Sequence, residues 1–264
     1  MNFSLDFLLI QTVLSFLLAM IRVQGFFMAA PIFSQSVIPP MIKIGISGLF
    51  CFWLYDAIFA NSTSLILTDP YMLVIGIIHE FFVGYIFGMV LNLIFDAIAT
   101  FAQMLGMQAG QSSDHVLNPS ADTSTSNIAL FYGNLSMWAF LSVGGLYQAA
   151  LILRKSFELI PLASYSFNLN TLALNYPKIF GQVFIIGLKF LLPLLAMMFI
   201  IDICVAFLSK ILPQASMFFL LMPAKLTVLG AFMILGLSGY WMNIDQYFTE
   251  DVFELFDTLL APRA

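Results

Sequence analysis

Six long runs of apolar residues dominate the chain, and short polar stretches separate them. A helix needs about 20 mostly apolar residues to cross a membrane, and each run meets or approaches that length. No alternation of apolar and polar residues extends over comparable lengths, so strands are not predicted. The pattern predicts an all-α, membrane-type bundle of about six long helices in a single domain over residues 1–264. The runs are Phe7 to Pro31, Ile42 to Ala60, Tyr71 to about Met104, Ile128 to Leu153, Gln182 to Leu208 and Phe218 to Met242.

Prolines and polar stretches agree with these limits. Pro39-Pro40 separates the first two runs, and Asp69-Pro70 precedes the third. Pro39-Pro40 closes the first turn, and Asp69-Pro70 is expected to open the third helix, because proline suits the first turn of a helix. Two connections are long: a polar one over 110–127 and a mixed one over 154–181.

Composition strengthens the membrane interpretation and excludes several classes of function. Hydrophobic residues make up 61% of the chain and charged residues only 9%, against roughly 45–50% and about 25% in soluble domains. The net charge of -5 leaves no basic patch for nucleic acid. Two cysteines and two histidines show no metal-ligand spacing. No catalytic, phosphate-binding or dinucleotide motif is present, so neither an enzyme nor a cofactor is expected.

Ionisable residues inside the apolar runs are costly, at roughly 2.5–3.5 kcal/mol each on insertion scales. In the third run they join a stripe of residues spaced by four, which lie on one helix face. The stripe should wind around the helix, because four residues overshoot a turn of 3.6. Its glycines favour close approach of another helix. We interpret it as a packing seam with buried charges; an ion path or an assembly interface is the alternative. The stripe includes Glu80, Gly84, Gly88 and Asp96. The other ionisable residues inside apolar runs are Arg22, Lys189 and Asp202.

Two further features carry candidate chemistry. Met104 and Met107 stand where the third run meets the polar connection, and flexible methionines suit either core filling or a pore constriction. The polar connection is longer than the 2–8 residues typical between packed helices, and by itself it indicates a solvated loop. Its polar and turn-forming residues are Gly110, Gln111, Ser112, Ser113, Asp114, His115, Asn118, Pro119, Asp122, Ser124 and Asn127.

An ordered set of residues and short motifs extends from about Arg22 to Tyr240. It includes Arg22, Pro31, Phe33, Lys43, Glu80-x3-Gly84-x3-Gly88, Gly106-x-Gln108-x-Gly110, Asn118-Pro119, Gly144-Gly145, Ser156-Phe157, Pro161, Pro193, Asp202, the turn motif Pro213-Gln214, Phe218 and Pro223-x-Lys225. This set resembles the FliR/SctT family, the export-gate subunit of flagellar and virulence type III secretion systems. This sequence has Asn118 where the family more often has Asp, and Ser216 near the place of a family Asn.

The resemblance implies a bundle of bent hairpins in the bacterial inner membrane, at the base of the flagellar or injectisome basal body. It implies several copies of FliP/SctR-like and FliQ/SctS-like partner subunits and one FlhB/SctU-like gate subunit. Unfolded export substrates would pass through the channel that they form, and the polar loop over 110–127 would act as its plug. From the residues alone, an ion-coupled secondary transporter using Glu80, Asp96, Lys189 and Asp202 is the alternative. A transporter would usually show two related halves.

Overall fold

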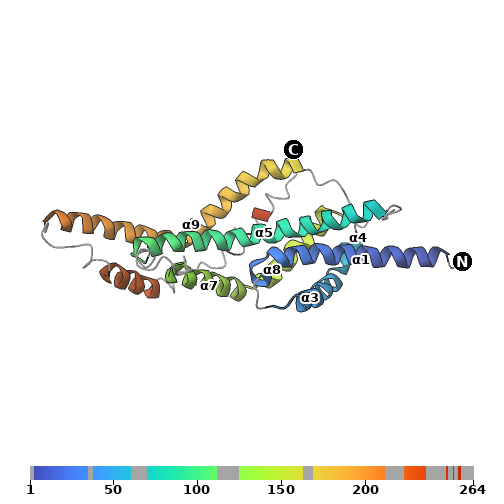
Figure 1. Ribbon diagram of the computed structural model, residues 1–264, viewed down its shortest axis with the longest axis horizontal. Coiled ribbons are helices and arrows are strands. Elements are labelled where there is room, and N and C mark those ends of the chain that lie inside the picture. The colour runs from blue at the N-terminus through green and yellow to red at the C-terminus, as the bar shows by residue number, and fades with distance from the viewer. Residues whose placement is uncertain are drawn as a thin grey trace, which may run out of the picture. The chain divides into compact units, whose positions relative to one another are not determined.

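The computed structural model describes residues 3–34, 38–60, 70–111, 125–162, 169–211 and 223–235, together with single residues 248, 252, 255 and 256. Within these residues all regular structure is helical, which confirms the all-α class. In Figure 1 the chain can be followed from its blue N-terminus through the helices. The helices are α1 (Phe3–Ala29), α2 (Pro31–Ser34), α3 (Pro40–Trp53), α4 (Tyr55–Ala60), α5 (Pro70–Gln108), α7 (Asn127–Ser142), α8 (Gly145–Leu159) and α9 (Leu169–Ile211). A further helix spans residues 223–235.

Membrane-length helices are fewer than the six predicted runs. Among the described residues, three helices are long and apolar enough to cross a membrane, over Ile10–Ala29, Tyr71–Gln108 and Pro177–Ile211. A fourth span results if α7 and α8 are taken together. The sixth run is described only over Pro223–Leu235, and the rest of it lies outside the described residues. The count of six therefore stays a prediction, whereas the membrane-type bundle is confirmed.

Two predicted spans are divided into shorter helices. The second run breaks at Leu54, a buried residue that lies between α3 and α4. The fourth run breaks at 143–144, where Gly144 has a φ of 77°. That left-handed conformation is strained for residues with a Cβ and open to glycine, so Gly144 ends one helix and starts the next. Hydropathy alone did not predict either break, because both interrupt continuous apolar sequence.

α5 and α9 are much longer than a membrane is thick. They contain 39 and 43 residues, which at 1.5 Å per residue gives about 58 and 64 Å. The hydrocarbon core is about 30 Å thick, and helix tilts rarely exceed 40°. A substantial part of each helix must therefore lie outside the hydrocarbon or be covered by protein.

The chain divides into two compact units. Unit 1 comprises Met1–Leu93, Gly144–Ile179 and Glu254–Ala264, and unit 2 comprises Ile94–Val143 and Phe180–Phe253. In unit 1, α1 packs against α2, α3 and α4, and α4 contacts α8. Phe27 is fully buried there, with its ring 4.1 Å from that of Phe33 and 5.3 Å from that of Phe50. The single domain over 1–264 stays a prediction.

Unit 2 has an aromatic core and a large exposed apolar surface. The rings of Phe95, Phe140 and Phe190 lie 5.7 to 6.3 Å from that of Phe248. By contrast, only 17% of the most apolar part of α9 is buried within the chain. Because the chain itself leaves this surface uncovered, it must face lipid or further apolar subunits.

Candidate functional site

α1 and α5 approach each other closely at three glycines of unit 1. A Cβ added at Gly84 would collide with the carbonyl oxygen of Arg22. Additions at Gly25 and Gly88 would collide with the carbonyl oxygens of Phe81 and Phe26. The two backbones are therefore in direct contact, which is the packing that small residues permit between membrane helices. This contact places the side chains of Arg22 and Glu80 at the same crossing.

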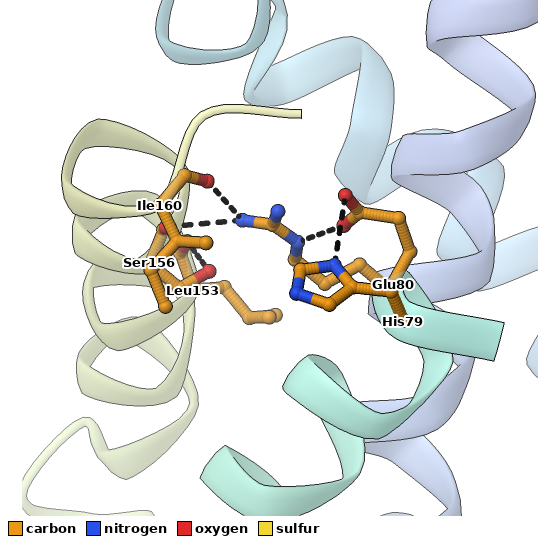
Figure 2. A network of polar contacts seen from close by, with 6 residues as sticks. His79, Glu80, Leu153, Ser156 and Ile160 are labelled. Carbon is orange, nitrogen blue, oxygen red and sulfur yellow. Dashed lines mark hydrogen bonds and ion pairs between the residues drawn. The ribbon is translucent and has the colours of Figure 1, made fainter. Parts of the chain in front are cut away.

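Arg22 and Glu80 form a fully buried ion pair at this crossing (Figure 2). Arg22 Nε donates to Glu80 Oε2 at 2.6 Å, and neither side chain is exposed. The second carboxylate oxygen, Oε1, lies 3.8 Å from His79 Nδ1. Both charges were expected to be buried, and the structure brings them together.

The other edge of the Arg22 guanidinium caps the C-terminal end of α8. Its Nη1 donates to the main-chain oxygens of Ser156 (3.0 Å) and Ile160 (2.9 Å), as Figure 2 shows. A cation is favoured at this end of a helix, where the macrodipole is negative. The guanidinium carbon also lies 4.4 Å from the ring centroid of Phe157, a cation–π contact. Among the described residues, Nη2 has no hydrogen-bond partner.

These contacts make Arg22 a staple that joins three distant segments of the chain, α1, α5 and α8. Its positive charge is balanced by the Glu80 carboxylate and by the helix end. An arrangement with both partners so engaged suits a structural role. Sequence reasoning identified the two charged residues, but it could not show the carbonyl oxygens at the end of α8, because every residue type carries one.

The remaining ionisable residues expected to be buried lie elsewhere. Asp96 on α5 and Lys189 on α9 are exposed in the isolated chain. Asp202 forms an ion pair with Lys225, which joins α9 to the helix over 223–235, with side chains 38% and 19% exposed. Asp96 is exposed because the stripe of α5 winds as predicted: Glu80, Gly84 and Gly88 are buried, and its later members are not. The interpretation of Asp96 and Lys189 as buried or helix-packing charges stays a prediction.

In unit 2, polar contacts close the base of the long connection between α5 and α7. Gln103 Oε1 accepts from the main-chain N–H of Ser126 (2.8 Å), and Gln111 Oε1 accepts from that of Ile128 (3.4 Å). The Ser126 hydroxyl caps α7 by accepting from Ala129 N at 3.1 Å. A Cβ on Gly106 would collide with this serine. We call Gln103, Gly106, Gln111 and Ser126 the loop neck.

Sequence reasoning missed two members of the neck, Gln103 and Ser126. A signal for Ser126 was present, because serine directly before an apolar helical run is a typical N-cap. Gln103 carried no such signal, since its partner is a main-chain N–H far along the chain. Gly110 at the neck has a φ of 87°, a conformation that glycine adopts readily.

The structure describes only the ends of the predicted plug loop. Gly110, Gln111 and Asn127 are described, and Met104 and Met107 are 43% and 50% exposed on α5. Among the described residues, no group of His, Cys, Asp or Glu has the arrangement of a metal site. The predicted residues outside the described ranges are Ser112, Ser113, Asp114, His115, Asn118, Pro119, Asp122, Ser124, Pro213 and Gln214.

Comparison with known proteins gives one consistent family. The sequence matches the family described as bacterial export proteins, family 1, over residues 13–250. It is 28% identical to the flagellar biosynthetic protein FliR of Buchnera aphidicola, over 86% of each chain. It is 22% identical to FliR of Escherichia coli, over 92% of this chain and 91% of that one. It is 24% identical to the Yop proteins translocation protein T of Yersinia pestis, over 96% of each chain.

Proposed function

We propose, on the premise that this chain belongs to the bacterial export proteins, family 1, that it forms the protein-conducting channel of a type III export gate together with partner subunits. The expected FliR/SctT membership is confirmed, and the chain is a membrane component of a type III export apparatus and not an enzyme. The observation that carries the proposal is the extent of the family match, which includes most of α1 and all the later described helices. The proposed location is the bacterial inner membrane.

The shape of the described helices supports an assembled rather than a solitary protein. α5 and α9 exceed the thickness of a membrane, and the apolar surface of α9 is largely uncovered. Further apolar subunits would cover such surfaces outside the hydrocarbon. Several FliP/SctR-like and FliQ/SctS-like subunits and an FlhB/SctU-like subunit are the proposed partners. Unfolded export substrates are the proposed cargo.

Co-expression tests this proposal against the transporter alternative. The tagged chain is produced alone and with its proposed small partner subunits, extracted in detergent, and analysed by size and native mass spectrometry. We expect an aggregating protein alone and a defined complex with the partners. A monodisperse single chain that binds and moves a small solute would instead establish the transporter and remove the export-gate proposal.

The loop over 110–127 is the proposed plug, with Met104 and Met107 as the proposed constriction beside it. The neck supports this assignment, because its hydrogen bonds hold the two ends of the loop together between α5 and α7. The test replaces residues 112–124 with a short glycine linker and keeps Ser126, since this residue caps α7. We expect an intact complex that leaks small ions. An intact complex with unchanged conductance would return the segment to an ordinary surface loop.

A further inference from the structure

One side of α9 packs against α5 in unit 2, and this contact fixes the direction in which Lys189 points. A Cβ added at Gly187 would collide with Ala97 of α5. Leu194 and Met198 continue the same side along α9, and each is at most 3% exposed. With a step of 100° per residue, Lys189 falls on the opposite side of the helix. Lys189 is accordingly exposed in the isolated chain.

The surface around Lys189 is otherwise apolar. Between positions 185 and 200, every other exposed residue that lies within about 60° of Lys189 on the helix circumference carries an aliphatic side chain or is a proline. A single cation therefore stands in the middle of an apolar face. We call this surface the lysine face of α9, and it consists of Lys189 with Ile185, Leu192, Pro193, Ala196 and Ile200.

The cation restricts what can cover this face. Ile185 and Ile200 are 51% and 61% exposed, so the face has to be covered by lipid or by an apolar subunit. An ammonium group enters the same apolar surroundings only at a large cost in free energy unless an anionic group meets it. The covering partner must therefore present a negative charge opposite Lys189.

The position of Lys189 along α9 favours a protein over a lipid headgroup. A headgroup contact requires Lys189 at the edge of the hydrocarbon core, which is about 30 Å thick. Towards the N-terminus, the apolar stretch extends only to Pro177, about 18 Å away and too short to span the core. Towards the C-terminus, the ion pair of Asp202 with Lys225 lies about 20 Å further along. That pair is partly exposed, and hydrocarbon would surround it at a high cost.

We propose that the lysine face of α9 docks on an apolar helix of a partner subunit, and that a carboxylate of this helix forms an ion pair with Lys189. This inference rests on the proposed function and deepens it, because it names the chemistry of the partner at one position. The aliphatic residues around Lys189 supply contact area that many apolar helices can match. The ion pair sets the register, since a shift of the partner by one turn would leave both charges in apolar surroundings.

Zero-length cross-linking in the assembled complex tests the ion pair. A carbodiimide joins an amine to a carboxylate only where the two groups are in contact, and mass spectrometry identifies the joined peptides. The pair of Lys225 with Asp202 is the internal control for access of the reagent. We expect a cross-link from Lys189 to an aspartate or glutamate of a partner subunit. It should be absent in Lys189→Arg, whose guanidinium keeps the charge but does not form the amide.

The yield of the complex tests the same pair without a reagent. Lys189→Met leaves the partner's carboxylate uncompensated, so we expect the yield to fall at least about tenfold, whereas Lys189→Arg should retain nearly the wild-type yield. Lys210→Met is the matched control, because Lys210 is an exposed lysine in the last turn of the same helix, and it should leave the yield unchanged. Replacing the cross-linked acid by its amide should partly restore the yield of Lys189→Met.

Any of three results would overturn the inference. The first is a wild-type yield of Lys189→Met. The second is a cross-link from Lys189 only to an acid of this same chain, or none although the control cross-link forms. The third is complete acetylation of Lys189 by a membrane-impermeant amine reagent, which would place it in water or at a headgroup. Each result is obtained on an assembled complex and leaves the proposed function standing, whereas a chain that never co-purifies with partner subunits would remove both.

Discussion

Replacing Glu80 with leucine should prevent assembly rather than block conduction. The substitution removes the carboxylate that accepts from Arg22 Nε at 2.6 Å in a site with no exposure on either side. The guanidinium stays buried, because its Nη1 remains bound to the main-chain oxygens at the end of α8. Leucine supplies no acceptor, so the guanidinium keeps its charge and loses its principal counterion.

The expected cost is large. Removing one partner of a buried ion pair typically destabilises a protein by about 3–5 kcal/mol, which is about 100- to 5,000-fold in the folding equilibrium. The two carbonyl contacts and the Phe157 ring remain, so the lower end of this range is expected for Glu80→Leu. Arg22→Leu should cost more, because it also leaves the carbonyl oxygens of Ser156 and Ile160 without their donor.

The matched control is an exposed pair in the same unit. Arg154 Nε lies 3.0 Å from Glu158 Oε1, with side chains 51% and 45% exposed. Exposed helical pairs four residues apart contribute about 0.3–0.5 kcal/mol, so Glu158→Leu should leave the complex nearly unchanged. The yield and thermal stability of the detergent-extracted complex are measured for both variants. Export is then measured in the complexes that do form.

A charge-swap variant tests whether Arg22 acts through the end of α8 as well as through Glu80. In Arg22→Glu/Glu80→Arg the pair is restored in reverse, but a carboxylate now faces the carbonyl oxygens at the end of α8. Acceptors would meet acceptors, so we expect no rescue. Recovery of wild-type yield by the swap would show that the α8 contacts contribute nothing. A Glu80→Leu complex that assembles at wild-type yield and fails to export would give the acid a transport role and refute the packing interpretation.

Three further outcomes follow from single contacts. Gly84→Ala should destabilise the complex by about 1–3 kcal/mol in thermal unfolding, since the new methyl group meets a backbone oxygen. The control Gly133→Ala, whose added methyl group has no atom within 4 Å, should be neutral or stabilising. Equal losses in the two variants would exclude the α1–α5 contact as the cause. Ser126→Ala should lower stability by about 1 kcal/mol through loss of the α7 cap, and it should raise ion leakage. If neither stability nor leakage changes, the role given to the loop neck is wrong. Asp202→Asn should weaken the complex by no more than about 1 kcal/mol, because the pair with Lys225 is partly exposed, and a loss matching that of Glu80→Leu would place this pair in a buried interface.

Much of the helical architecture was predictable from local sequence. The runs beginning near Phe7 and Tyr71 became α1 and α5, and Pro70 begins a helix as expected. These features are local, because a long apolar run and a proline act on their own segment whatever the rest of the chain does. The cost of burying Arg22 and Glu80 was likewise visible, since it depends on charge and hydropathy alone.

Tertiary structure decided how those elements and charges are used. The breaks at Leu54 and Gly144 interrupt continuous apolar sequence, and hydropathy does not register a change in backbone direction. The end of α8 binds Arg22 through main-chain oxygens, which no residue type reveals. Asp96 belongs to the same periodic stripe as Glu80, but it is exposed because the core contacts a different side of α5 at that depth. A helical pattern defines a face, and only the neighbouring helices determine whether that face is buried, paired or left to water.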